Sequence, residues 1–470
     1  MPIIILVADG VRTDTLRAAI GSGKLPAMAR MMEDGGLHEI TSVFPSVTGP
    51  AYTPFLMGKH PGSVGMPGLR WYDRSRKDCA GPGHARSYVG IDMRLADRDI
   101  DPASPTMFDL VPNSVAAMSV ITRGLHPSRF FTRGPSFAAR AAWTHFRGDV
   151  DGWLEIDRYV SRRLVAMVRE LEPDFVFAAF TGVDKVSHAR GYESDDVNEA
   201  LRIVDDTISG IRRDLEDSGK WQATHLWVVS DHGHTPVNAH EDLVGLLQQL
   251  GHRPLAHPWV FTRDPRTAVM VSGNAMAHLY LDLETRSRRW WPALAPEWSG
   301  LATELLARDS TDLALLPCGE ARCEIRSHAA GSALLEWRED FYSYKPGTGD
   351  PLGIGECIDV SGDDSYALTV GGEYPDALVQ IARIARSPRS GDIILSAARD
   401  WDLRAGFEPI PHVSSHGALH RDHMLVPLLA SRPLPGAPLR TVDLMPIALD
   451  ALSIPHPPGL EGRSRRGQSR

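Results

Sequence analysis

The segment Ile3-Ile-Ile-Leu-Val-Ala8, followed directly by Asp9-Gly10, decides how the fold of this chain is interpreted. Six apolar residues in a row, without alternation, are typical of a strand that is buried on both faces, as in a parallel sheet. The polar pair then lies at the carboxyl end of the strand. In open sheets of this kind, ligands bind beyond the carboxyl ends of the strands. The segment therefore predicts both a sheet and the edge of that sheet where a site is expected.

Three similar apolar segments recur along the chain. Two of them lead into polar clusters: Phe175-Val-Phe-Ala-Ala-Phe180 precedes Thr181-Gly-Val-Asp184, and His225-Leu-Trp-Val-Val229 precedes Ser230-Asp-His-Gly-His234. The third is Met424-Leu-Val-Pro-Leu-Leu429. Pro427 in the last segment favours an edge strand or a bulge. Helical patterns lie at 154–171, 197–215 and 443–452. The alternation predicts an α/β fold with a mostly parallel central sheet.

Two regions depart from this alternation. Residues 67–110 are rich in Gly, Pro, Arg and Asp and predict a long surface excursion that borders the site. Residues 284–390 carry many Trp, Arg and Pro residues without a site motif and predict an inserted subdomain. The strand-like segment Asp392-Ile-Ile-Leu-Ser396 marks the return of the chain to the core. We therefore expect one catalytic core that is formed by residues 1–283 and 391–470.

The composition is that of a globular protein with an excess of acidic residues. The 470 residues include 50 basic and 59 acidic ones, so the formal net charge is −9. A nucleic-acid polymer is not an expected partner, because binding it requires a basic surface. The first apolar run is too short to span a membrane, and four cysteines do not make a disulfide framework. Since no signal peptide is visible, we expect a cytoplasmic protein without a membrane partner; the oligomeric state stays open.

Aspartate and histidine residues recur in the polar clusters. Both are typical ligands of zinc in hydrolytic sites, where the metal lowers the pKa of bound water or alcohol. Six of them provide three ligands for each of two metal ions: Asp9, Asp184, His188, Asp231, His232 and His416. A pair of metal ions about 4 Å apart can hold both oxygens of an in-line displacement at phosphorus. The sequence indicates a two-metal site for an anionic substrate, with zinc as the expected ion and manganese as the alternative.

The segment Phe44-Pro-Ser-Val-Thr-Gly-Pro50 supplies the nucleophile that such a site needs. Thr48 lies on a turn between Pro and Gly residues, and coordination to a metal ion would activate its hydroxyl group, which is otherwise a poor nucleophile. The alternative is that Thr48 caps the N-terminus of a helix. Both roles are compatible, because a helix N-terminus also favours a phosphate group.

Together these segments resemble the alkaline phosphatase superfamily, in particular its type I phosphodiesterase/nucleotide pyrophosphatase branch. The matching segments occur in the family's order: Val7-Ala-Asp-Gly-Val-Arg12, Phe44-Pro-Ser-Val-Thr48, Gly58-Lys-His-Pro-Gly-Ser-Val-Gly65, Asp184-Lys-Val-Ser-His188, Ser230-Asp-His-Gly233 and Ser415-His-Gly417. The segments 441–447 and 460–464 are also similar to the closing part of these enzymes. The resemblance implies an alkaline-phosphatase-like fold, with helices on both faces of the central sheet and an inserted subdomain.

The resemblance also implies a role for each ligand. Asp9, Thr48, Asp231 and His232 would hold one zinc ion, and Asp184, His188 and His416 would hold the other. Thr48 would attack phosphorus and form a phospho-threonine intermediate, which water at the second zinc ion would release. The expected substrate is a small phosphorylated molecule.

One position departs from the family pattern. The branch usually carries an Asn three residues after the nucleophile, whose amide binds a phosphoryl oxygen, but this chain has Ala51 there. Other donors must then bind that oxygen. The substrate-binding candidates are the backbone N–H group of Gly49, the side chains of Tyr52 and Lys185, and, as a more distant contact, Arg12. Alternatively, Arg12 caps a helix and Lys185 is solvated.

The resemblance and the residues favour a metal-dependent phosphodiesterase or pyrophosphatase. A phosphodiester carries one charge and needs a pocket for its second substituent, which Trp71-Tyr72 and the region 284–390 would form. A phosphomonoester carries two charges and usually needs an Arg or Lys side chain to bind them. A phosphomonoesterase, a phosphonate hydrolase and a catalytically silent binding homologue remain the alternative functions.

Overall fold

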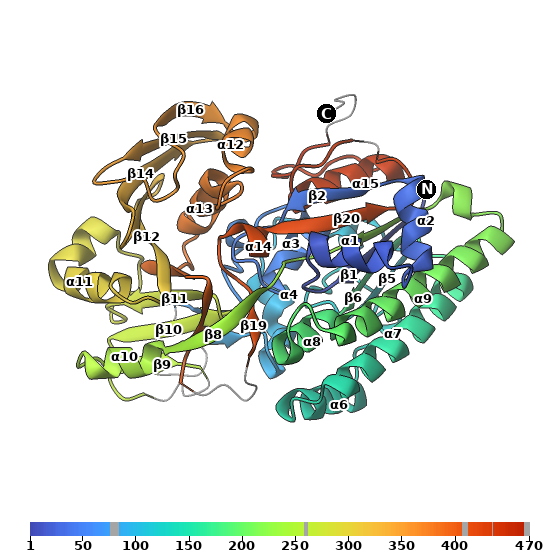
Figure 1. Cartoon of the computed structure of the whole chain (residues 1–470), viewed down its shortest axis with the longest axis horizontal. Coiled ribbons are helices and arrows are strands. Elements are labelled where there is room, and N and C mark those ends of the chain that lie inside the picture. The colour runs from blue at the N-terminus through green and yellow to red at the C-terminus, as the bar shows by residue number, and fades with distance from the viewer. Residues whose placement is uncertain (76–83, 258–261, 407–411, 435, 465–470) are drawn as a thin grey trace.

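The computed structural model contains two large β-sheets, which lie in opposite halves of the molecule (Figure 1). It describes residues 1–75, 84–257, 262–406, 412–434 and 436–464. The strands of the first sheet follow the order β2 (Leu37–Thr41), β20 (Leu425–Ala430), β7 (His225–Val229), β1 (Ile3–Ala8), β6 (Phe175–Phe180) and β5 (Ser114–Ala117). β1 pairs in parallel with β6 and β7, and β6 pairs in parallel with β5. The central sheet is therefore mostly parallel.

Helices cover both faces of this sheet because its central strands are apolar on both sides. In β1, Ile4 and Leu6 pack in one core with α1 (Thr13–Gly21), α2 (Pro26–Asp34), α7 (Val150–Leu171) and α9 (Asp195–Asp217). Ile3 and Ile5 pack in the opposite core with α3 (Thr53–Met57), α5 (Met107–Leu110) and α15 (Leu444–Leu452). The three predicted helices correspond to α7, α9 and α15, and the predicted α/β class is confirmed.

The segment that contains Pro427 forms an inner strand, so the prediction of an edge strand is wrong. β20 pairs antiparallel with β2 on one side and with β7 on the other. The carbonyl oxygen of Pro427 accepts a hydrogen bond (3.2 Å) from the N–H group of Ser230, directly after the last residue of β7. Ser230 lies one residue beyond the end of β7, so the N–H group that Pro427 lacks is missing only from the end of this ladder.

The second sheet has nine strands and extends beyond the predicted insert of residues 284–390. Its order is β16 (Cys357–Ser361), β15 (Phe341–Pro346), β14 (Gly331–Arg338), β13 (Arg322–Ser327), β12 (Thr311–Gly319), β17 (Ile393–Ala397), β11 (Met276–Leu281), β10 (Thr267–Ser272) and β9 (Pro254–Ala256). α10 (Leu243–Gln249) and α11 (Trp291–Leu306) pack on one face, and α13 (Ala377–Ala385) packs on the other. β9–β11 and β17 lie outside residues 284–390, so the predicted insert continues a sheet that begins before it. The division of the chain into domains stays a prediction.

A small third sheet connects the two halves and lies next to the edge where the site is expected (Figure 1). It consists of β18 (Asp400–Arg404), β8 (Thr235–Asp242) and β19 (Ser414–Ser415). The remaining longer helices are α6 (Pro135–Phe146), α8 (Gly182–Arg190) and α12 (Gly362–Thr369), and α4 (Ala96–Asp99) and α14 (Arg421–Met424) are single turns. Within the described part of the chain, every helix is too short or too polar to cross a membrane.

The excursion at residues 67–110 contains the antiparallel pair β3 (Arg70–Tyr72) and β4 (Ala85–Ser87). Trp71 and Tyr72 are buried in it. The Nε1–H group of Trp71 donates to the hydroxyl group of Tyr88 (3.2 Å), and the ring of Tyr72 packs against Tyr280 of β11. Trp71 thus packs within the excursion, and Tyr72 attaches it to the second sheet. Neither residue lines the cavity beside Thr48, so they do not form the substrate pocket that was expected of them. Cys79 lies outside the described residues, and the other three cysteines are free.

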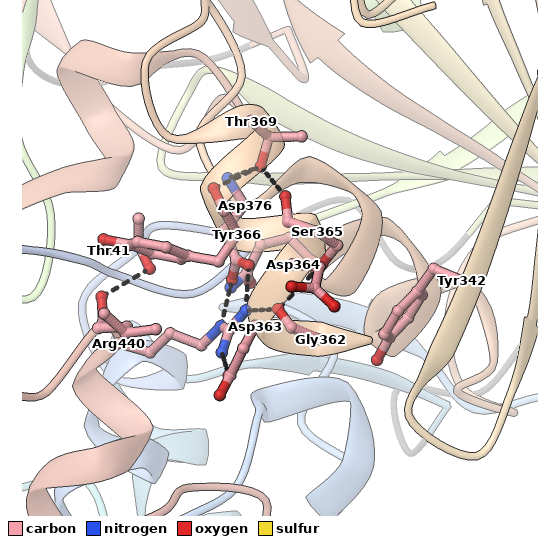
Figure 2. Close-up of polar contacts among 12 residues, drawn as sticks. Thr41, Tyr342, Gly362, Asp363, Asp364, Ser365, Tyr366, Thr369, Asp376 and Arg440 are labelled. Carbon is pink, nitrogen blue, oxygen red and sulfur yellow. Dashed lines mark hydrogen bonds and ion pairs between the residues drawn. The ribbon is translucent and has the colours of Figure 1, made fainter. Parts of the chain in front are cut away.

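A buried ion pair joins the two halves of the molecule (Figure 2). Arg440, which precedes α15, donates through Nε to Oδ2 of Asp376 (2.8 Å) and through Nη2 to Oδ1 (2.6 Å). Nη2 also donates to the carbonyl oxygen of Gly362 (2.6 Å). Thr41, at the end of β2, pairs with Arg440, while Asp376 directly precedes α13. The ion pair thus fixes a helix of the second half against the end of the first sheet.

Replacing Arg440 by Leu would leave the buried carboxylate of Asp376 without its cation. Removing one partner of a buried ion pair costs about 3–5 kcal/mol, so we expect the free energy of unfolding in urea to fall by that amount. The matched control is Arg202→Leu, because Arg202 pairs with Glu199 at the surface (2.9 Å), where such pairs contribute about 0–1 kcal/mol. Equal losses in the two variants would contradict the role assigned to Arg440.

Candidate active site

The parallel strands bring the predicted ligands to one edge of the central sheet. Their registers align Ala8 with Phe180 and Val7 with Val229, so the residues that follow β1, β6 and β7 lie side by side. Asp9 follows β1, and Asp231 and His232 follow β7. α8 begins directly after β6 and places Asp184 and His188 on one side, since they are four residues apart. His416 reaches the same edge because it follows β19.

Thr48 lies in the loop between β2 and α3, directly before a short 3₁₀ turn (Pro50–Tyr52). Its Oγ1 donates to Oδ1 of Asp9 (2.9 Å) and lies 3.1 Å from Nε2 of His232. Gly49 has a φ of +94°, a left-handed conformation that favours glycine. Thr48 does not cap a helix, because Gly49 precedes the 3₁₀ turn and Tyr52 precedes α3. The loop therefore points the threonine hydroxyl group at two of the predicted metal ligands.

We call Asp9, Asp231 and His232 the first ligand group. Nε2 of His232 lies 3.2 Å from Oδ1 of Asp9 and 3.7 Å from Oδ2 of Asp231. All three side chains are buried, and within the described residues Oδ2 of Asp9 and Oδ2 of Asp231 accept no hydrogen bond. Buried carboxylate oxygens without a donor are costly unless a cation compensates them. Carboxylate and imidazole ligands are also those that divalent metal ions such as zinc prefer.

The second ligand group gathers around a single oxygen atom, Oδ1 of Asp184. Nε2 of His234 lies 3.0 Å from this atom, Nε2 of His188 lies 3.2 Å away and Nε2 of His416 lies 3.5 Å away. The rings of His416 and His232 stack at 3.6 Å, so the two ligand groups adjoin. Oδ2 of Asp184 accepts a hydrogen bond from Nζ of Lys185 (2.7 Å).

Backbone oxygen atoms fix the orientation of three of these imidazole rings. Nδ1 of His188 lies 2.8 Å from the carbonyl oxygen of Ser414, Nδ1 of His416 lies 3.0 Å from that of Ser46, and Nδ1 of His232 lies 3.1 Å from that of Gly233. A carbonyl oxygen only accepts, so each Nδ1 carries the proton in these bonds. Nε2 is then the free ligand atom, an arrangement that is typical of metal-binding histidines.

The pKa values agree with a site that is built for positive charge. Burial lowers the pKa of His188 and of His234 to about 4 and that of His416 well below its ordinary value, so these rings are neutral near pH 7. Burial, together with the nearby Asp9, raises the pKa of Asp231 well above its usual range. Burial also opposes the charge on His232, yet Asp231 and Asp9 raise its pKa to about 9. The donor types, their burial and this electrostatic balance all fit two divalent metal ions.

A cavity of about 100 Å³ opens beside Thr48 and the second ligand group. Its wall includes Arg70 and Lys185, and apolar residues such as Leu69, Val89 and Trp153. The excursion contributes Leu69, Arg70 and Val89 to this wall. A larger hollow, of about 660 Å³ near Arg383, contains none of the predicted site residues. Thr48, the predicted nucleophile, lines the smaller cavity.

Of the substrate-binding candidates, Lys185 lines this cavity, and its Nζ lies 5.9 Å from the ring centre of Trp153. Tyr52 is fully buried, packs edge-on against Phe177 of β6 at 5.2 Å and does not line the cavity, so it belongs to the core and not to the substrate-binding surface. Gly49 shapes the loop, as described above. The position of the missing Asn, Ala51, is buried with Val43 and Val442, so it does not open into the cavity.

Arg12 lies away from the cavity and has a different set of partners. Its Nη1 donates to the carbonyl oxygen of His234 (3.0 Å), and Nη2 pairs with Asp14 (2.6 Å) and Asp422 (3.3 Å). Although Arg12 directly precedes α1, its side chain makes no capping hydrogen bond. Arg12 is therefore placed to hold the backbone of the loop that carries the ligands after β7.

Two residues at the site were not predicted from the sequence. His234 completes the second ligand group, and its signal was its place in the same polar cluster, two residues after His232. Asp157 of α7 accepts hydrogen bonds from the N–H groups of Thr181 (3.2 Å) and Gly182 (2.7 Å), and so fixes the start of α8. Its burial raises the pKa of Asp157 to about 7. No local sequence signal indicates this contact, because it joins two elements that meet only in the fold.

Comparisons with known proteins agree with this geometry. A family model described as type I phosphodiesterase/nucleotide pyrophosphatase matches residues 3–294. A search of curated proteins found no match. Among solved structures, phosphonoacetate hydrolase from Sinorhizobium meliloti 1021, in complex with phosphonoformate, has a TM-score of 0.57 and 18% identity over 96% of this chain and 95% of that chain.

Two further solved structures are forms of ectonucleotide pyrophosphatase/phosphodiesterase 5. An inactive murine variant in complex with AMP has a TM-score of 0.56 and 13% identity over 99% of this chain and 97% of that chain. The human protein has a TM-score of 0.55 and 14% identity over 100% of this chain and 97% of that chain. At these identities the likeness to the solved structures shows the fold alone.

Proposed function

The chain belongs to the type I phosphodiesterase/nucleotide pyrophosphatase family, whose members are hydrolases of phosphoester and pyrophosphate bonds, and we propose that Thr48 is its nucleophile at a site for two divalent metal ions. The observation that carries this proposal is the position of the Thr48 hydroxyl group. It touches Asp9 and His232 of the first ligand group. Thr48 also lines the cavity, together with Asp184, His188 and His416 of the second group.

The reaction has two steps on this chain. Oγ1 of Thr48 forms a bond to phosphorus while the bond from phosphorus to the leaving oxygen breaks, and the hydroxyl proton leaves toward Oδ1 of Asp9, its hydrogen-bond acceptor. Water then attacks the phospho-threonine and releases the product, which restores the hydroxyl group. Two bound divalent ions, zinc or manganese, would lower the pKa of the hydroxyl group and neutralise charge on the phosphoryl oxygens.

The proposed substrate class is a phosphodiester or a pyrophosphate, and one observation favours a second candidate. The cavity is small and carries the cationic side chains of Lys185 and Arg70, which suits a compact molecule with two anionic groups. A phosphonate hydrolase is therefore the second candidate, and a hydrolase of phosphonoacetate is among the structural neighbours. A cytoplasmic location and a small dissolved substrate remain predictions from the sequence.

A substrate profile tests these assignments. We expect the zinc-loaded protein to hydrolyse bis(p-nitrophenyl) phosphate with a higher kcat/KM than p-nitrophenyl phosphate. Release of phosphate from phosphonoacetate at a higher kcat/KM would favour the second candidate. If the metal-loaded protein turned over none of these compounds, including a dinucleotide pyrophosphate, the chain would be a silent binding homologue.

Lys185 is the candidate that replaces the missing Asn amide as a donor to the phosphoryl oxygen. Removing one such donor costs about 2.7–4 kcal/mol of transition-state stabilisation, so we expect Lys185→Met to lower kcat about a hundredfold or more with little change in KM. The matched control is Lys220→Met, because Lys220 pairs with Glu172 at the surface (2.6 Å). Metal content is measured in parallel, since Lys185 also contacts Asp184; a loss of less than threefold with full metal content would contradict this role.

A further inference from the structure

The second ligand group contains more protein ligands than the sequence predicted. Nε2 of His234 is closer to Oδ1 of Asp184 (3.0 Å) than Nε2 of either His188 (3.2 Å) or His416 (3.5 Å). His234 is fully buried, and its ring lies 4.9 Å from that of His188 and 5.1 Å from that of His416. Three imidazole nitrogens therefore approach the same carboxylate oxygen, Oδ1 of Asp184.

The surroundings of His234 hold its ring in this orientation. Its Nδ1 lies 3.0 Å from Oγ of Ser414, whose carbonyl oxygen orients His188. One residue of β19 thus directs two imidazole rings to the same place. Gly10 provides the space, because a Cβ atom at this position would lie 2.8 Å from Nε2 of His234. These contacts leave Nε2 as the atom that His234 presents to the ligand group.

We propose that His234 is a fourth protein ligand of the second metal ion, beside Asp184, His188 and His416, and that this site holds an ion with more than four ligands. The inference rests on the proposed two-metal function. Four-coordinate zinc with four protein ligands has no open position, as in structural zinc sites, whereas hydrolytic sites keep one open. A zinc ion that expands to five ligands, or an ion such as Co²⁺ or Mn²⁺ that accepts five or six, retains such a position beside the same four side chains.

Titration of the metal-free protein with Co²⁺ tests this inference, because the visible spectrum of Co²⁺ reports its coordination number. We expect the native protein to bind two Co²⁺ ions, with the weak bands of a five- or six-coordinate ion at the second site. His234→Gln keeps an N–H donor near Asp184 but offers a poor ligand. We expect it to weaken one site more than about a hundredfold, beyond the 10–100-fold that loss of an outer-shell partner costs. At saturation its spectrum should gain the intense bands of four-coordinate cobalt.

The matched control is His456→Gln. Nε2 of His456 lies at the same distance, 3.0 Å, from Oδ1 of Asp450, but this pair is at the surface and lacks further imidazole rings. We expect its Co²⁺ titration to equal that of the native protein. If His234→Gln also retained native affinity and spectrum, His234 would be only a hydrogen-bond donor to Asp184, and the inference would be overturned.

A second measurement does not depend on the folding of a variant. In a crystal structure of the native protein loaded with Co²⁺, we expect anomalous density about 2.0–2.2 Å from Nε2 of His234, the range of metal–imidazole bonds. An ion bound by Asp184, His188 and His416 but more than about 3 Å from His234 would overturn the inference and leave the two-metal proposal intact. Binding of fewer than two ions by the native protein would instead contradict the two-metal proposal itself.

Discussion

Thr48→Ala is expected to abolish hydrolysis while the protein stays folded and keeps its metal ions. The substitution removes the only hydroxyl group in this loop that touches Asp9 and His232, and it leaves every residue of both ligand groups in place. Loss of a covalent nucleophile lowers kcat by roughly 10⁴-fold or more, and the activity that remains comes from binding and electrostatic stabilisation alone. Steady-state turnover of bis(p-nitrophenyl) phosphate, with circular dichroism and metal analysis, measures each part of this prediction.

Thr48→Ser is the matched control, because it restores the hydroxyl group without the methyl group. We expect this variant to recover a large part of the activity that Thr48→Ala loses. Rapid acid quenching of the native reaction should also trap an adduct on the peptide that contains Thr48, which mass spectrometry identifies as the substituted phosphoryl group. Turnover by Thr48→Ala near the native rate, or an adduct on another residue, would contradict the covalent mechanism.

Asp231→Asn is expected to lower metal content and activity together. Asn keeps the size of the side chain, and its carbonyl oxygen can still accept from the N–H group of Gly10 (3.3 Å to Oδ1 of Asp231). The substitution removes the negative charge of the side chain and makes it a weaker metal ligand in the first ligand group. Because loss of an outer-shell partner alone costs about 10–100-fold in affinity or activity, we expect loss of this direct ligand to exceed a hundredfold. His416→Ala should have the same effect on the second ion.

Asp205→Asn separates metal loss from general damage. Asp205 is also buried and accepts hydrogen bonds from the backbone N–H groups of Met28 (2.8 Å) and Ala27 (3.2 Å). It thereby links α9 to the start of α2, away from the site. We expect this variant to lose stability and to retain its metal ions and kcat. Native protein should also lose activity in a chelator and regain it with zinc or manganese. Full activity of demonstrably metal-free protein would exclude the two-metal mechanism.

The sequence predicted those features that depend on short segments. The apolar runs at β1, β6 and β7 are local, and a strand that is buried on both faces must be almost entirely apolar. The chemical types at the strand ends are also local, so the sequence by itself indicates six candidate ligands: Asp9, Asp184, His188, Asp231, His232 and His416. In the structure these six side chains lie at one edge of the sheet, in the two adjoining ligand groups.

Other features depend on partners that are distant in the sequence. Pro427 lies in an inner strand because the N–H group that it lacks is missing only from the end of the ladder with β7. Tyr72 is an aromatic residue in a polar excursion, a pattern that fits a pocket wall equally well, and its packing against the distant Tyr280 decides that it is buried. Arg12 contacts the backbone of His234, 222 positions away. No window of sequence contains both members of such contacts.

The clearest division between sequence and structure is at the loop that follows β7. The sequence alone indicates that Ser230-Asp-His-Gly-His234 follows a buried strand and carries side chains of the types that bind metal ions. Which carboxylate each of its two histidines approaches could not be read from spacing, because the loop turns at Gly233 and sends the rings of His232 and His234 to different carboxylates. The tertiary structure decided this, since Asp9 and Asp184 reach those rings from two other strand ends that only the folding of the parallel sheet places beside β7.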